Sequence, residues 1–85
     1  MYYVYVIVNE EGKPYIGFTS DLEKRLKTHN ANGNESTKGH KWRYAYYEAF
    51  ADREDAVLRE RRLKSHGQGK RQLKARIERS IGVRK

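Results

Sequence analysis

The chain opens, after its first methionine, with an unbroken run of Tyr, Val and Ile from Tyr2 to Val8. Aromatic and β-branched side chains favour an extended strand. Turn-forming residues follow at 9–12, and residues 13–18 form a second short strand, which Pro14 restricts to a sheet edge or a strand start. The first segment of the chain is therefore predicted to be a β-hairpin over residues 2–18.

A helix and a long loop follow the hairpin. Ser20 and Glu23 have the spacing of a capping box, which predicts a helix over residues 21–30. Residues 31–41 are polar and rich in Gly and Asn, so we expect a loop that is long for so small a domain. Three residues at i, i+4 and i+7 share one face of the helix: Leu22, Leu26 and His29.

The second half of the chain adds one strand and two helices. Residues 42–50 alternate again and form the third strand, Asp52 caps a helix over 53–65, and a basic helix follows over about 70–80. A chain of 85 residues has room for one domain. We therefore expect one α/β (α+β) domain over residues 1–85, with a three-stranded mixed sheet flanked by helices in the order ββαβαα.

The positive charge is concentrated in one part of the chain. Residues 1–52 hold seven Lys/Arg and seven Asp/Glu, so the net charge of +8 lies entirely in residues 53–85. Nucleic acid is the commonest partner for such a segment, although a solvated basic surface would look the same. An anionic membrane surface is a weaker alternative, because the basic region lacks the large apolar face of an interfacial helix.

The absence of cysteine excludes disulfides and thiolate metal sites, and it fits the reducing cytoplasm. No apolar run approaches the roughly 20 residues that a membrane span needs, and the first residues lack the features of a secretory signal. We therefore expect a cytoplasmic protein with no membrane association.

Taken singly, each candidate site residue has both a functional and a purely structural interpretation. Glu60 falls inside the apolar arc of its helix, where a carboxylate must be paired or bind a ligand, but Lys64 at i+4 offers an ordinary ion pair. His29 could be a core histidine, with Arg25 on its flank as a phosphate ligand. Tyr5 and Tyr15 could equally be packing residues of a sheet.

The joint spacing of these residues indicates a family. Tyr3-Val4-Tyr5, then Tyr15-Ile16-Gly17, then the helix at 20–30 and the helix at 56–64 together resemble the GIY-YIG nuclease superfamily. The resemblance covers about residues 2–64. It is greatest to small stand-alone bacterial members that are similar to the catalytic domain of the bacterial excinuclease.

The resemblance implies hydrolysis of a nucleic-acid phosphodiester with one divalent metal, Mg²⁺ or Mn²⁺. It assigns Glu60 as the metal ligand, Arg25 to the scissile phosphate, His29 to proton relay, Tyr5 as base and Tyr15 as its positioner. A free tyrosine has a pKa near 10, so Arg25, His29 or the metal would have to lower the pKa of Tyr5 or take its proton onward. Glu48 is the second choice as metal ligand, although a role as a structural hydrogen-bonding partner is favoured for it.

The chain departs from the family pattern at two places. The first triplet begins with Tyr3 instead of Gly, and no Asn follows the Glu60 helix, where Gln68 and Lys70 stand. The alternative is therefore a nucleic-acid-binding module with little or no cleavage. No base-reading motif is present, so a partner protein could supply targeting to the substrate, which we expect to be DNA. The side chains expected to contact nucleic acid are Arg25, Lys27, His40, Lys64, Lys70, Arg71 and Lys74.

Overall fold

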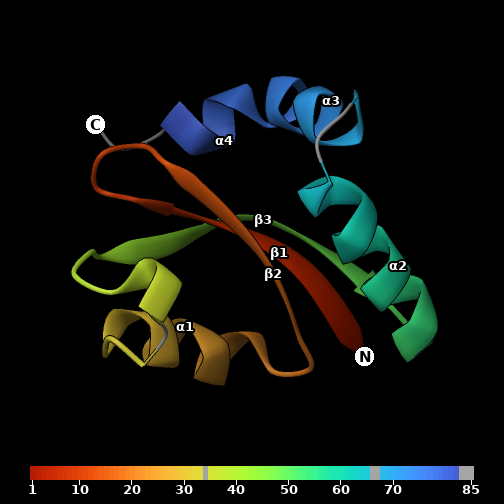
Figure 1. Cartoon of the computed structure of the whole chain (residues 1–85), viewed down its shortest axis with the longest axis horizontal. Helices are drawn as coiled ribbons and strands as arrows, with labels where there is room; N and C mark the ends of the chain where they lie inside the picture. Colours follow the sequence, from red (N-terminus) through yellow and green to blue (C-terminus); the bar gives the residue numbers. More distant parts are fainter. Residues whose placement is uncertain (34, 66–67, 83–85) are drawn as a thin grey trace.

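The computed structural model describes residues 1–33, 35–65 and 68–82. In this part of the chain three strands form one sheet, and helices cover both of its faces (Figure 1). The element order is the expected ββαβαα, except that a short 3-10 helix precedes the third strand and the last helix is divided in two. The α+β fold is therefore confirmed. Residues 83–85 of the predicted domain lie outside the described residues.

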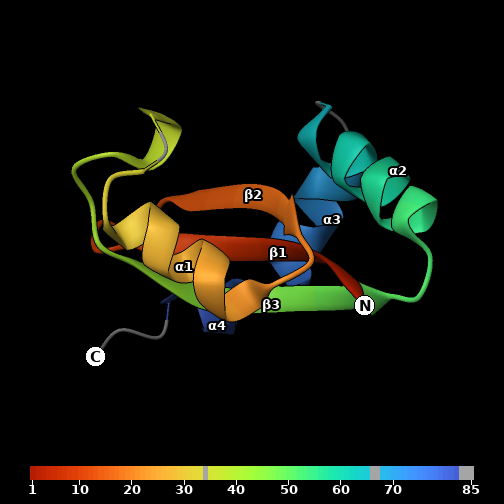
Figure 2. The ribbon, with the colours of Figure 1, turned by 90° about the horizontal axis from the view of Figure 1, so that it is seen from below.

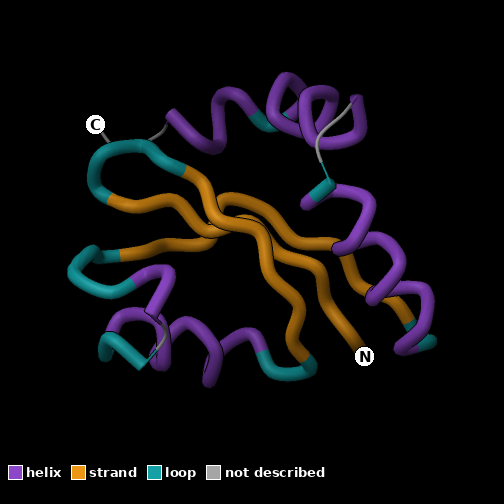
Figure 3. Tube along the Cα trace, viewed as in Figure 1, coloured by secondary structure: helices purple, strands orange, loops and turns teal. Residues whose placement is uncertain are grey.

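The sheet has the hairpin at one edge and the third strand at the other. Strand β1 (Tyr2–Asn9) lies between β2 (Pro14–Thr19) and β3 (Trp42–Phe50), as the trace in Figure 3 shows. Both pairings are antiparallel. The prediction of a mixed sheet is wrong in this respect. Although β2 and β3 run in the same direction, β1 separates them, so no parallel neighbours exist among the described strands.

Carboxylate caps set the starts of the first two helices. Helix α1 (Leu22–Asn30) is capped by Asp21, whose Oδ1 accepts from the Lys24 amide at 3.0 Å, so the expected capping box at Ser20 is displaced by one residue. Helix α2 (Arg53–Lys64) is capped by Asp52, as predicted. Both caps satisfy amides that have no partner within the helix.

Two segments depart from the sequence-based expectation. The predicted helix over 70–80 is divided into α3 (Gln68–Arg76) and α4 (Glu78–Gly82). The polar loop contains the 3-10 helix η1 (Glu35–Thr37), which buries the side chain of Thr37. None of the described helices combines the length and the apolar character needed to cross a bilayer.

The two faces of the sheet carry separate cores. In Figure 2, α1 lies in front of the sheet, whereas α3 and α4 lie behind it. The core under α1 contains Tyr5, Ile7 and Trp42, with Tyr15, Leu22, Leu26 and Tyr44 packed against it. The core on the opposite face contains Val4, Val6, Ile16, Ala56, Leu63, Leu73 and Ile77.

A β-bulge changes which side chains of β3 share a face. Val6 pairs with Tyr46 and Ile7 with Tyr44, so Ala45 is the extra residue between them. As a result Tyr44 joins the core under α1, whereas Tyr46 joins the core under α2. Simple alternation would have placed both on one face.

Candidate active site

A chain of three buried polar side chains forms the centre of the site. The phenol of Tyr5, which is 1% exposed, lies with Oη 2.8 Å from Nε2 of His29. The other ring nitrogen, Nδ1, lies 2.8 Å from Oγ1 of Thr37. His29 and Thr37 are both fully buried. Strand β1, helix α1 and the loop helix η1 thus each contribute one member of a continuous hydrogen-bonded chain.

The ring of Tyr5 lies directly on the backbone of Gly17, its register partner on β2. A Cβ atom at position 17 would lie 2.3 Å from Oη and 2.4 Å from Cζ of Tyr5. Glycine is therefore required here because the neighbouring phenol occupies the space of a side chain. Tyr15 completes the wall, with its ring centroid 5.5 Å from that of His29.

Charges from two helices act on the Tyr5 phenol. Burial raises its pKa to about 12, with smaller increases from Tyr15 and Glu60, whereas the Arg25 guanidinium lowers it. Because burial outweighs the guanidinium, Arg25 does not bring the pKa of Tyr5 below its ordinary value, which leaves the metal or onward transfer of the proton, the other routes considered from the sequence. Burial, and to a lesser degree Arg25, also lowers the pKa of His29. At neutral pH the site holds a protonated phenol beside a neutral imidazole.

Glu60 lies at the edge of this site and forms an ion pair with a lysine of its own helix. Its side chain is 24% exposed, and Oε2 lies 3.2 Å from Nζ of Lys64. The ordinary i,i+4 pair considered from the sequence is thus present. The same ammonium lies 5.2 Å from the centroid of the Tyr15 ring. The carboxylate is accessible to cations and close enough to Tyr5 to affect its pKa.

A polar groove runs beside Arg25 along the start of α1. The structure gives it a volume of about 540 Å³. Arg25 is half-buried, so its guanidinium can meet a ligand in the groove without being fully solvated. The other lining residues are Thr19, Ser20, Asp21, Lys24, Thr28 and Gly33.

The remaining candidates lie in different places. Lys70 and Lys74 line a second pocket together with Tyr15, whereas Lys27 and Arg71 are exposed on α1 and α3. His40 lies with Nδ1 2.8 Å from Oε2 of Glu10, in the β1–β2 turn.

The environment of His40 is acidic. His40 and the Lys41 amide hold the pKa of the Glu10 carboxyl at about 2, and Glu11 lies in the same cluster. A phosphate contact by His40 therefore stays a prediction, and two neighbouring carboxylates oppose it.

Glu48 is the structural hydrogen-bonding partner that the sequence favours over its second-choice role as a metal ligand. The bulge turns Glu48 toward α2, where Arg59 donates to both carboxylate oxygens at 2.8–3.0 Å and Tyr46 donates to Oε2 at 2.7 Å. Burial raises the pKa of this carboxyl, but the bonds from Arg59 and Tyr46 outweigh burial and lower it. Glu48 is a structural ion-pair partner.

Sequence reasoning missed two residues of the site. Thr37 fixes Nδ1 of His29, and Tyr44 packs edge-on against Tyr5 at 5.6 Å while its hydroxyl donates to the Leu22 carbonyl. Thr37 lies in a loop without periodicity, so no local signal marks it. The sequence places Tyr44 in the third strand, but the face that it occupies depends on the bulge.

Comparison with known proteins places the sequence of this chain in a family. The sequence profile of the GIY-YIG catalytic domain matches residues 1–76. A UPF0213 protein of Bacillus pumilus is 38% identical over 79 residues, covering 85% of this chain and 76% of its own length. UPF0213 proteins of Lacticaseibacillus paracasei and Haloquadratum walsbyi are 41% and 34% identical, covering 69% and 84% of this chain and 68% and 82% of their own lengths. No solved structure gives a significant match.

Proposed function

Because the chain belongs to the GIY-YIG catalytic-domain family, we propose that it is an endonuclease that cleaves DNA phosphodiester bonds with one divalent metal ion. The observation that carries this proposal is the buried Tyr5–His29–Thr37 chain. Arg25 and Glu60 add a guanidinium and a carboxylate whose charges reach the same phenol. A buried hydrogen-bonded chain whose terminal phenol feels the charges of Arg25 and Glu60 suits proton transfer at an anionic substrate.

Tyr5 takes the proton of the attacking water without first becoming a phenolate. With a pKa of about 12, only about one molecule in 10⁵ would hold a phenolate at pH 7. With the imidazole proton on Nδ1, facing Thr37, Nε2 of His29 accepts the phenol proton as Oη accepts the proton of water. The relay thus needs a neutral imidazole, which the lowered pKa of His29 favours.

The residues present fit a divalent metal ion at Glu60. Its carboxylate is partly exposed and already attracts the Lys64 ammonium, so a cation can reach it. A single carboxylate that leaves most coordination positions to water suits Mg²⁺ or Mn²⁺. Such an ion, when bound, supplies charge stabilisation for the phosphate and the leaving oxygen.

Basic side chains hold the substrate. Arg25 binds the scissile phosphate from the polar groove, because a guanidinium can donate two parallel hydrogen bonds to phosphate oxygens. The further phosphates are held by the other predicted contact residues on α1, α2 and α3, namely Lys27, Lys64, Lys70, Arg71 and Lys74. We expect this activity in the cytoplasm, with a partner protein supplying the choice of site.

A second candidate function is DNA binding with little or no cleavage. The net charge of +8 in residues 53–85 favours binding to a polyanion whether or not the phosphate is then cut. Both candidates predict salt-sensitive affinity, so affinity alone does not separate them.

Conversion of supercoiled plasmid to the nicked form tests the proposal. The purified protein should nick in Mg²⁺ or Mn²⁺ and not in EDTA, and Glu60→Gln should abolish nicking while its circular dichroism spectrum stays unchanged. Glu54→Gln makes the same change at an exposed position of α2 and should nick normally. Nicking by Glu60→Gln at the wild-type rate would refute the metal assignment. DNA binding without nicking in either metal would favour the second candidate.

A further inference from the structure

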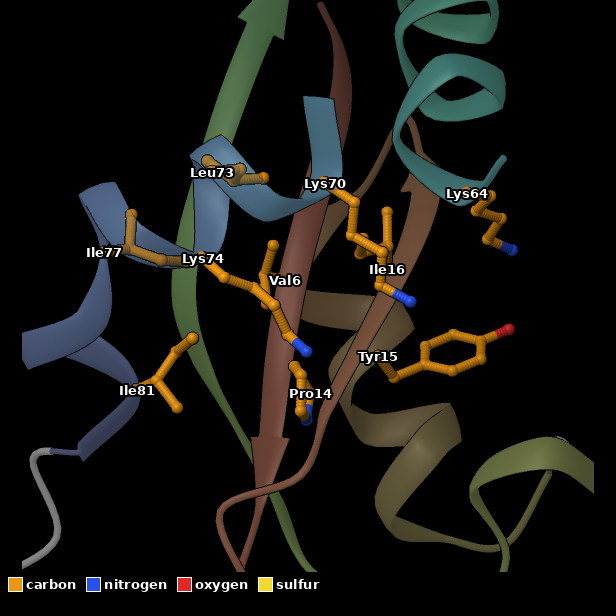
Figure 4. A pocket seen from close by; sticks show the side chains of 10 residues that line it. All are labelled: Val6, Pro14, Tyr15, Ile16, Lys64, Lys70, Leu73, Lys74, Ile77 and Ile81. Carbon is orange, nitrogen blue, oxygen red and sulfur yellow. The ribbon is translucent and has the colours of Figure 1, made fainter. Parts of the chain in front are cut away.

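A second pocket adjoins the candidate active site on its α3 side. It lies between strands β1 and β2 and helices α3 and α4 and has a volume of about 250 Å³. Figure 4 shows an apolar floor crossed by lysine side chains. The apolar lining residues are Val6, Pro14, Ile16, Leu73, Ile77 and Ile81, and the remaining ones are Tyr15, Lys64, Lys70 and Lys74.

All the charged side chains that line this pocket are positive. Three lysines line it, and none of the described residues that line it is acidic. In Figure 4 the ammonium groups of Lys64, Lys70 and Lys74 follow one another across the mouth of the pocket. A row of cations above an apolar floor complements a ligand that joins an uncharged body to several anionic groups.

The pocket is continuous with the candidate active site through two residues. Tyr15 packs against His29 on one side and lines the pocket on the other. Lys64 pairs with Glu60 and lies over the Tyr15 ring. A nucleic-acid strand whose scissile phosphate lies at Arg25 and Glu60 can therefore place its neighbouring nucleotides at the row of lysines.

We propose that this pocket takes one unstacked nucleobase of the substrate strand, next to the phosphate that is cut, while the flanking phosphates lie on the lysine row. The inference rests on the proposed function. A base has apolar faces and phosphates on both sides, which matches the floor and the row. The volume is below the range of drug-sized sites, so it suits one ring system.

This arrangement defines a substrate class. Removing a base from its stack costs a few kcal/mol, least where the base is unpaired or mismatched. The protein should therefore cut preferentially where the neighbouring base can leave the helix with little cost.

Binding of two short oligomers in EDTA tests the pocket separately from cleavage. The probes are a thymidylate pentamer and an abasic pentamer with the same number of phosphates. The thymidylate pentamer should bind about fivefold more tightly, the lower end of what a base stacked on an aromatic ring contributes in single-strand binders, because Tyr15 is the one aromatic side chain among the described lining residues. It should also shift the methyl resonances of Ile77 and Ile81 in NMR spectra, whereas the abasic pentamer should not.

Two pairs of variants test whether the difference in affinity arises at this pocket. Ile81→Ser should reduce the preference for the thymidylate pentamer about fivefold, whereas Leu58→Ser, on an exposed face of α2, should retain it. Lys74→Gln should weaken both pentamers alike and more than Lys38→Gln, which removes the same charge from the loop.

Equal affinities for the two pentamers would overturn the inference and leave the proposed nuclease intact if plasmid is still nicked. Binding that leaves the pocket methyls unmoved would also overturn it, because the base would then lie elsewhere. Conversely, a clear preference without nicking would support the pocket and refute the cleavage proposal.

Discussion

A methyl group added at Gly17 would occupy space that is already filled by the ring of Tyr5. In the absence of a neighbour, Gly→Ala in a strand is expected to stabilise a protein by about 0.5–1 kcal/mol. Here the new Cβ would lie 2.3 Å from Oη and 2.9 Å from Cε1 of Tyr5. The ring has little room to move, because it is 1% exposed and packs edge-on against His29 and Tyr44.

The expected destabilisation of Gly17→Ala follows from two losses. Overpacking of a filled core costs about 1–3 kcal/mol. A displaced phenol also loses its bond to Nε2 of His29, which contributes about 1 kcal/mol. Set against the gain of about 0.5–1 kcal/mol, they predict a net decrease of about 1–3.5 kcal/mol in the free energy of unfolding. Plasmid nicking should also decrease strongly, because the proposed proton relay is broken.

Urea unfolding followed by circular dichroism measures the first quantity. Gly69→Ala is the control: it adds the same methyl group in the first turn of α3, where its Cβ would meet the nearest atoms at 3.9 Å, so this variant should be at least as stable as the wild type. The double variant Gly17→Ala/Tyr5→Leu should lose about 1–3 kcal/mol less than the sum of the single changes, since the clash disappears with the ring. A Gly17→Ala protein as stable as the wild type, or strictly additive changes, would refute the reasoning.

Three further predictions concern the site and its supports. Arg25→Ala should lower nicking by orders of magnitude while the affinity for DNA falls little, because one phosphate contact among many is lost; a large loss of affinity in a filter-binding assay would argue against this assignment. Arg59→Met should destabilise the protein by about 1–2 kcal/mol at pH 7, because Glu48 loses its charged partner. Urea unfolding should show this difference shrinking as the pH falls below the ordinary carboxyl pKa of 4.5, because the lowered pKa of Glu48 gives stability that protonation removes. His29 should titrate below pH 6.5 in NMR spectra. The free energy of unfolding should rise with pH through that region, because as the pH falls the unfolded chain binds the imidazole proton before the folded protein does. Titration of His29 above pH 6.5 would contradict the buried neutral imidazole.

Local chemistry explains how much of the fold the sequence predicts. The run of aromatic and β-branched residues from Tyr2 to Val8 favours a strand locally, and the cap of α2 depends on Asp52 and the amide two residues later. The cap of α1 differs from the prediction by one residue, because Ser20 and its neighbour Asp21 are both capping residue types. The division of the last helix into α3 and α4 is not predicted by the sequence.

Residue identity and order by themselves determined the strands, the first two long helices and the family, and they predicted a site made of Tyr5, Tyr15, Arg25, His29 and Glu60. Tertiary structure alone decided three other features: the face of Glu48, the contact of Thr37 with His29, and the pocket between β2 and α3. The physical reason is that each of these depends on the register or packing of segments distant in the chain. A bulge is set by the partner strand, and a pKa by the burial that the whole fold imposes.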